Sequence, residues 1–139
     1  MKAANKTNKV IIDTNLWISF LIGKNLHHLL QDILDEQLVV VTSKEQLKEL
    51  LSTVAKPKLE KYFHPEQVAS FFSFLNEYAI FAPVTSTVTV CRDAKDNFLL
   101  ALAKDSLANY LITGDKDLLV IKKFEETQIV TIAEYRMNE

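Results

Sequence analysis

Short apolar runs alternate along this chain with segments whose apolar residues recur at helical spacing. Residues 10–12, 38–41 and 110–113 show no polar alternation, which is typical of strands buried on both faces of a parallel sheet. Two further strands are expected at residues 79–82 and 128–131. Strands that alternate with helices in this way predict an α/β fold with a mainly parallel sheet and right-handed crossovers.

The segments between the strands place apolar residues three or four positions apart, as on one face of an α-helix. Four such faces are Leu26, Leu29, Leu30, Ile33 and Leu34; Leu47, Leu50, Leu51 and Val54; Val68, Phe71, Phe72, Leu75 and Tyr78; and Phe98, Leu99, Leu102 and Ala103. A shorter helix is expected before Gly23, and another at the end of the chain. A capping box at residues 43–46 opens the second of the four helices, and Pro57 ends it. The third begins near Pro65 and the fourth at residues 93–96.

Length and composition favour one compact domain, residues 1–139, in which residues 1–8 form a flexible polar N-terminus. Hydrophobic residues make up 48% and charged residues 24%, which is close to the average for soluble globular proteins. No apolar stretch approaches the ~18 residues of a transmembrane helix, and no secretory signal opens the chain. A cytoplasmic protein without a membrane partner is therefore expected.

Low counts of three residue types exclude several kinds of site. The two glycines, Gly23 and Gly114, are too few for a P-loop or a dinucleotide fingerprint. A single cysteine, Cys91, excludes an internal disulfide and a CxxC zinc pattern. The three histidines do not form HExxH, so a histidine-held catalytic zinc is not expected.

Carboxylates follow the predicted strands where an α/β sheet binds its ligands, beyond the carboxyl ends of the strands. Asp13 follows the first strand, and Asp115 follows the strand at residues 110–113. Asp96 lies at the start of the helix that leads into that strand. Glu49 lies in the helix after the second strand, near the border of its buried face. From this position its side chain could point into the cleft. The sequence therefore predicts that four acids converge.

Converging carboxylates without matching basic residues repel one another and raise their own pKa values unless a cation neutralises them. Ligation by oxygen alone suits Mg²⁺ or Mn²⁺. Such a site activates a water and stabilises the charge that develops on a phosphate. Metal-dependent hydrolysis of phosphodiesters is therefore the leading chemistry.

Three segments resemble the PIN domain, a family of metal-dependent ribonucleases. Residues 10–15, VIIDTN, look like its opening motif. Residues 91–119, CRDAKDNFLLALAKDSLANYLITGDKDLL, resemble the subgroup of PIN toxins of bacterial toxin–antitoxin systems, and residues 48–59, KELLSTVAKPKL, are similar to its second acidic motif. The resemblance covers nearly the whole chain after its first residues.

The resemblance implies a role for each acid near the predicted cleft. The metal-binding and catalytic acids would be Asp13, Glu49, Asp96 and Asp115, with Asp93 and Asp117 as auxiliary carboxylates and with Asn15 and Thr113 orienting Asp13, the water or a phosphate oxygen. Glu45, one helical turn from Glu49, is the alternative second ligand, and Glu49 is preferred because it precedes the KPKL segment. Ala94 and Lys95 stand where the subgroup often has a proline and an acid, which should change the local loop without removing a ligand.

The fold that the resemblance implies is a three-layer α/β/α sandwich with a mainly parallel sheet of about five strands. The implied activity is that of an endoribonuclease, in which a water activated by one or two Mg²⁺ or Mn²⁺ ions attacks an RNA phosphodiester. The implied partners are an RNA substrate, a cognate antitoxin and a second copy of the chain in a homodimer.

Two other functions are compatible with parts of the pattern. A degenerate PIN domain would bind RNA or a protein without cutting, although every candidate acid is retained. A HAD-type phosphatase would need a second acid two positions after its nucleophilic aspartate, and Asn15 stands there instead.

The charge balance does not exclude RNA. The formal net charge is −2, from 16 basic and 18 acidic residues, which alone argues weakly against a nucleic-acid partner. Setting aside the four predicted ligands leaves 14 acidic residues against 16 basic ones, a balance of +2. The acidity of the chain is therefore largely that of the predicted metal site.

Overall fold

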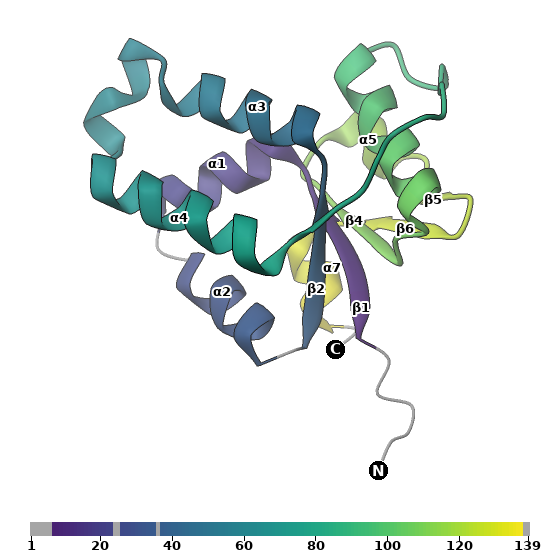
Figure 1. Ribbon diagram of the computed structural model, residues 1–139. Helices are drawn as coiled ribbons and strands as arrows, with labels where there is room; N and C mark the ends of the chain where they lie inside the picture. Colours follow the sequence, from purple (N-terminus) through teal and green to yellow (C-terminus); the bar gives the residue numbers. More distant parts are fainter. Residues whose placement is uncertain (1–6, 24–25, 36, 138–139) are drawn as a thin grey trace.

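A six-stranded sheet forms the centre of the molecule, and the computed structural model describes residues 7–23, 26–35 and 37–137 (Figure 1). The strand order is β3-β2-β1-β4-β6-β5. The strands are β1 (Asn8–Ile12), β2 (Leu38–Thr42), β3 (Ile80–Phe81), β4 (Tyr110–Ile112), β5 (Lys123–Phe124) and β6 (Thr127–Val130). All neighbouring strands are parallel except β5 and β6, which pair as an antiparallel hairpin.

The predicted α/β fold with a mainly parallel sheet is confirmed, and each of the five predicted strands is present. The sixth strand, β5, was not predicted. Left-handed backbone occurs at Lys122 (φ 67°), just before β5, and at Glu125 (φ 54°), in the turn of the hairpin, where no glycine or asparagine marks it in the sequence. The prediction of a flexible segment over residues 1–8 is wrong at Asn8, which pairs with Leu38 in β1; residues 1–6 lie outside the described residues.

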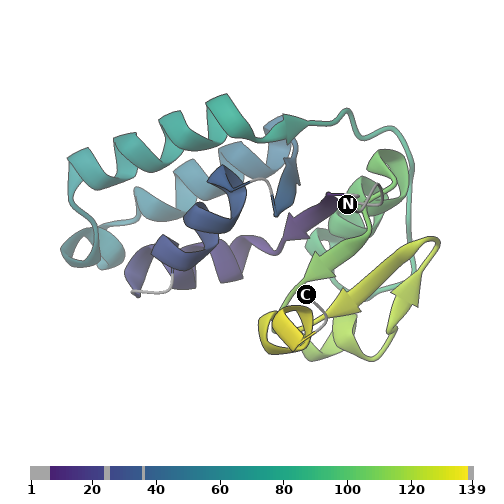
Figure 2. The ribbon, with the colours of Figure 1, turned by 90° about the horizontal axis from the view of Figure 1, so that it is seen from below.

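Helices cover both faces of the sheet. They are α1 (Thr14–Ile22), α2 (Leu26–Leu34), α3 (Lys44–Val54), the 3₁₀-helix η1 (Pro57–Tyr62), α4 (Pro65–Tyr78), α5 (Ala94–Ser106), α6 (Lys116–Leu119) and α7 (Ile132–Met137). Figure 2 shows α1 to α4 gathered on one side of β1 and α5 on the other. Within the described residues, none of these helices is both long and apolar enough to cross a membrane.

The buried strand β1 separates the two halves of the core. Val10, Ile11 and Ile12 are each 0% exposed, which explains why this run shows no polar alternation. Val10 and Ile12 pack with residues of α1 to α4 and α7, whereas Ile11 packs with residues of α5 and α6. The result is a three-layer arrangement of helices, sheet and helices.

Three residues expected on buried helical faces are exposed, namely Leu34 (47%), Leu51 (45%) and Tyr78 (43%). In α3 the packed row runs through Leu50, which is fully buried, and Val54, which packs against the core. Leu51 lies about 100° farther around the helix than Leu50 and therefore turns toward the surface. The helical pattern was correct, but the buried faces are narrower than predicted.

Gln46 lies in the first turn of α3 and ties this helix to the sheet. As the capping box predicts, its backbone N–H donates to Ser43 Oγ at 3.0 Å. Its side chain, however, donates to the Ile12 carbonyl at 2.8 Å and to Thr14 Oγ1 at 3.3 Å, and it accepts a bond from the Thr42 hydroxyl. The residue is 1% exposed, so a buried amide fixes α3 against the carboxyl ends of β1 and β2.

We expect Gln46→Ala to lower the free energy of unfolding by about 2 kcal/mol or more, because it leaves the buried Ile12 carbonyl without this donor and opens a cavity. Gln67→Ala, the same change at an exposed position of α4, should cost less than about 0.5 kcal/mol. Urea unfolding followed by circular dichroism measures both. Equal, small losses would show that the buried amide network does not stabilise the fold.

Candidate metal site

A cavity of about 360 Å³ lies beyond the carboxyl ends of the central strands. Its lining includes Lys95 and six carboxylates, which are Asp13, Glu45, Glu49, Asp93, Asp96 and Asp115. Asp13 and Asp115 lie beyond the carboxyl ends of β1 and β4. The other four acids lie in α3 or at the start of α5. The cavity is therefore strongly acidic, and all four predicted metal ligands line it.

Asp13 is held rigidly at the end of β1. Its backbone N–H donates to the Ile112 carbonyl at 3.0 Å, and its carboxylate caps α1 by accepting the Asn15 N–H at 3.1 Å. The Thr113 hydroxyl donates to Asp13 Oδ2 at 2.6 Å. Thr113 thus orients Asp13 directly, whereas Asn15 does so through its backbone.

Burial raises the pKa of Asp13, because the carboxylate is only 6% exposed. The hydrogen bonds from Thr113 and from the Asn15 backbone act in the opposite direction, and the negative charges of Asp115 and Glu49 raise the pKa further. The carboxylate is desolvated and surrounded by other acids, which is the environment that a cation relieves.

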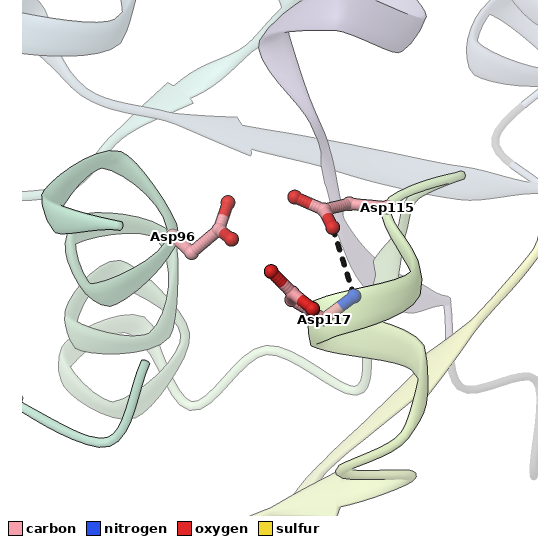
Figure 3. Close-up of side chains that lie close together, drawn as sticks. All are labelled: Asp96, Asp115 and Asp117. Carbon is pink, nitrogen blue, oxygen red and sulfur yellow. Dashed lines mark hydrogen bonds between the residues drawn. The ribbon is translucent and has the colours of Figure 1, made fainter. Parts of the chain in front are cut away.

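Asp96, Asp115 and Asp117 each offer a carboxylate oxygen, and these atoms lie within 4.8 Å of one another (Figure 3). Asp96 projects from the first turn of α5. Asp115 caps α6 by accepting the Asp117 N–H at 2.9 Å. Three separate carboxylates thus converge on one small volume, as oxygen ligation of a divalent cation requires.

The Asp96 carboxylate is the strongest indication of a ligand. The residue is 6% exposed, and its Oδ2 atom is buried without a hydrogen-bond partner. The pKa of Asp96 is raised to about 7, mainly by burial and also by the close Asp115 carboxyl and the charges of Asp93 and Asp13. A buried, partnerless carboxylate oxygen is costly unless it binds a proton or a cation, so the residues present suit a divalent ion.

Glu49 lines the same cavity from α3. Its Oε1 atom accepts the Thr14 hydroxyl at 2.8 Å, and its Oε2 atom lies 3.1 Å from Lys95 Nζ. Glu45 also lines the cavity but is exposed, whereas Glu49 is half-buried. Glu49 is thus the more enclosed of the two, and its choice over Glu45 as the second ligand stays a prediction.

The two auxiliary acids have different surroundings. Asp93 is exposed and caps α5, where its Oδ1 atom accepts the Lys95 N–H at 2.8 Å. Asp117 belongs to the converging group, although the sequence placed it outside the principal ligands, and Arg92 pairs with it at 3.2 Å.

Sequence reasoning missed the contacts of Thr14 and Gln46, the pairing of Lys95 with Glu49 in the cavity, and the pairing of Arg92 with Asp117. Thr14 directly follows Asp13, and Gln46 belongs to the capping box after the second predicted strand. Their positions beyond the ends of predicted strands could therefore have indicated that both lie at the cavity. The contacts of Arg92 and Lys95 join segments that the sequence separates widely, and only the folded chain shows them.

The comparisons with known proteins agree with this architecture. Residues 9–117 match the family described as PIN domain. The chain belongs to the PIN-domain family. It is 36% identical over 117 residues to the uncharacterized protein MJ1680 of Methanocaldococcus jannaschii, a match that covers 82% of this chain and 75% of that protein. No solved structure matches the chain.

PIN domains are typically metal-dependent nucleases, and the acidic group of this PIN domain could hold such a metal. Family membership also sets aside the HAD-type phosphatase as the alternative enzyme. The role of each individual acid stays a prediction, which experiments on the protein must test.

The raised pKa of Asp96 predicts how stability depends on pH when no metal is present. The native state holds this proton more tightly than the unfolded chain, so its advantage exists at low pH and is lost as the pH rises from about 4 toward 7. In EDTA, we expect this residue alone to lower the free energy of unfolding by roughly 2 kcal/mol between pH 5 and pH 8.

Asp96→Asn should remove that loss, which urea unfolding at the two pH values measures. Asp105→Asn is the matched control, because hydrogen bonds from Ser86 and Thr85 lower the pKa of Asp105 and keep it ionised throughout this range. The same pH dependence in wild type and Asp96→Asn would contradict the assignment.

Proposed function

We propose that this PIN domain is a metal-dependent endoribonuclease that hydrolyses RNA phosphodiester bonds. The observation that carries the proposal is the buried, partnerless Oδ2 atom of Asp96, a residue that lines the acidic cavity and converges with Asp115 and Asp117. Structural acids are normally exposed or paired, whereas a catalytic metal site assembles carboxylates and leaves their oxygens free for the ion.

The proposed ligands of Mg²⁺ or Mn²⁺ are Asp13, Glu49, Asp96 and Asp115, with Asp93 and Asp117 in support. One or two bound ions would lower the pKa of a water molecule and stabilise the charge that develops on the phosphate. Asp96 would release its proton when an ion binds, because its raised pKa leaves it partly protonated near neutral pH.

The remaining polar residues of the cavity orient the acids. Thr113, which directly follows β4, donates to the Asp13 carboxylate, and Thr14 donates to Glu49 from the start of α1. The acids are thus fixed on rigid elements before any substrate arrives, which reduces the cost of reaching the reactive geometry. The alternative function, a PIN domain that binds RNA or a protein without cutting, retains the fold but needs no such arrangement.

Asp13→Asn should reduce RNA cleavage to the level seen in EDTA, because it removes the negative charge at the end of β1. The side chain can keep one hydrogen-bond acceptor, so the fold should persist, as circular dichroism would verify. Asp35→Asn, the same change at an exposed acid after α2, should cleave like wild type. The measurement is loss of labelled RNA with Mg²⁺, with Mn²⁺ and with EDTA, and activity that survives in Asp13→Asn would refute the assigned site.

RNA that the wild-type protein binds but does not cut, with either metal, would favour the binding module instead. A phosphomonoester serves as the control substrate, since a phosphodiesterase site should leave it intact.

We further propose that the protein is the toxin component of a bacterial toxin–antitoxin system. Residues 91–119 support this role through their resemblance to the toxin subgroup of the family. An antitoxin that covers the acidic cavity and a homodimer would be the expected partners.

The toxin proposal predicts that induced expression arrests bacterial growth. Asp13→Asn, expressed to the same level, should relieve the arrest, because the toxicity would come from RNA cleavage. Colony counts after induction measure the effect. Normal growth with active wild-type protein would contradict the toxin role while leaving the nuclease proposal in place, and a neighbouring small gene for a DNA-binding protein would identify the candidate antitoxin.

A further inference from the structure

A second cavity, of about 260 Å³, adjoins the acidic cavity. Three residues line both cavities, namely Asp13, Asn15 and Asp115. Leu16 and Ser19 of α1 and Gly114 line the second cavity but not the first. Because Asp13 and Asp115 are proposed metal ligands, a group bound in the second cavity would lie next to the reacting phosphate.

Two polar side chains of α1 line the second cavity without a partner in the chain. Asn15 and Ser19 are four residues apart and therefore lie on the same side of the helix. The hydrogen bonds that both residues make within the described chain use the backbone: the Asn15 N–H donates to Asp13, and the Ser19 carbonyl accepts the Gly23 N–H. Both residues are exposed, so an amide and a hydroxyl are available to a ligand.

Gly114 leaves open space at this cavity. A Cβ atom added to Gly114 would meet no atom within 4 Å beyond its neighbours in the chain, so packing does not require a glycine here. Its φ angle is not positive, so the backbone does not require one either. What the glycine provides is room beside Asp115, which a ligand in the cavity would use.

The charges of the lining determine which part of a nucleotide the second cavity suits. Asp13 and Asp115 are the charged residues of its described lining, and a phosphate bound there would meet two carboxylates and no cation. The other lining residues are neutral and include the half-buried Leu16. An amide, a hydroxyl and an apolar surface suit a ribose and its base, which are neutral and combine hydrogen-bonding edges with an apolar face.

We propose that the second cavity binds the nucleoside next to the scissile phosphate, with Asn15 and Ser19 as its hydrogen-bonding residues. The inference rests on the proposed function for the nature of the substrate, and it adds where the neutral part of that substrate is held. The volume is slightly below the ~300–1,000 Å³ of pockets for drug-sized ligands, which fits a single nucleoside.

The test measures kcat/KM for cleavage of a labelled single-stranded RNA with Mn²⁺. Ser19→Leu fills the cavity from an exposed helical position and should lower kcat/KM by about tenfold or more, because the nucleoside loses its hydrogen bonds and its packing. Ser19→Ala removes the hydroxyl alone and should lower it by about twofold to tenfold. Gly114→Leu adds a side chain at another lining position and should act like Ser19→Leu.

Matched controls separate loss of the subsite from damage to the metal site. Ser73→Leu and Ser73→Ala make the same changes at an exposed position of α4 and should cleave like wild type. The electron paramagnetic resonance signal of free Mn²⁺ should show the same ion affinity in wild type and in both Ser19 variants, because Ser19 does not line the acidic cavity.

A substrate change tests the contact itself. In a series of RNAs that carry one abasic nucleotide at each position in turn, wild type should cut the bond beside the missing base less efficiently. Ser19→Leu should lose most of this difference, since the base that is removed no longer has a place to bind.

Unchanged kcat/KM in both filling variants would overturn the inference and leave the nuclease proposal in place, and so would a loss that follows weaker Mn²⁺ binding. If wild type binds RNA without cutting it, the same variants are compared by fluorescence anisotropy of the labelled RNA. A higher Kd in Ser19→Leu would then support the subsite and refute the nuclease. An unchanged Kd, or a wild type that neither binds nor cuts RNA, would refute both.

Discussion

Repulsion between carboxylates is the constraint that the rest of this structure must satisfy. The parallel register places Ile12 opposite Ile112, so the residues that follow β1 and β4 meet at the same edge of the sheet. Three of the acids there, Asp13, Asp93 and Asp115, each cap a helix and accept the N–H two residues further along. Backbone donors and the positive ends of helices thus stabilise the charges, and Asp96, which caps no helix, has the strongly raised pKa.

The layers behind the cavity hold these groups in place. The buried Gln46 amide connects α3 to β1 and β2, and the Thr113 hydroxyl connects β4 to Asp13. Because these contacts lie on strands and helices packed on both faces, a shift of one acid would disturb the central sheet. The position of the site is therefore a property of the whole fold.

The sequence predicted most of the fold because its strands are apolar runs and its helices repeat apolar residues at helical spacing. It missed β5, whose two residues carry no periodic signal, and the short elements η1 and α6 for the same reason. It also predicted that four acids converge, since the carboxyl ends of parallel strands meet at one edge of the sheet. The pairing of Lys95 with Glu49 was beyond its reach, because that contact depends on the distance between α3 and α5 in the folded chain.

The two edge strands of the sheet are short. β3 and β5, the two outermost strands, have two residues each, so each offers almost no row of free backbone groups to a strand from another molecule. Growth of the sheet by strand addition, a common route to both aggregates and peptide capture, is disfavoured at either margin. A protein that docks on this chain is thus left with side-chain surfaces as its means of recognition.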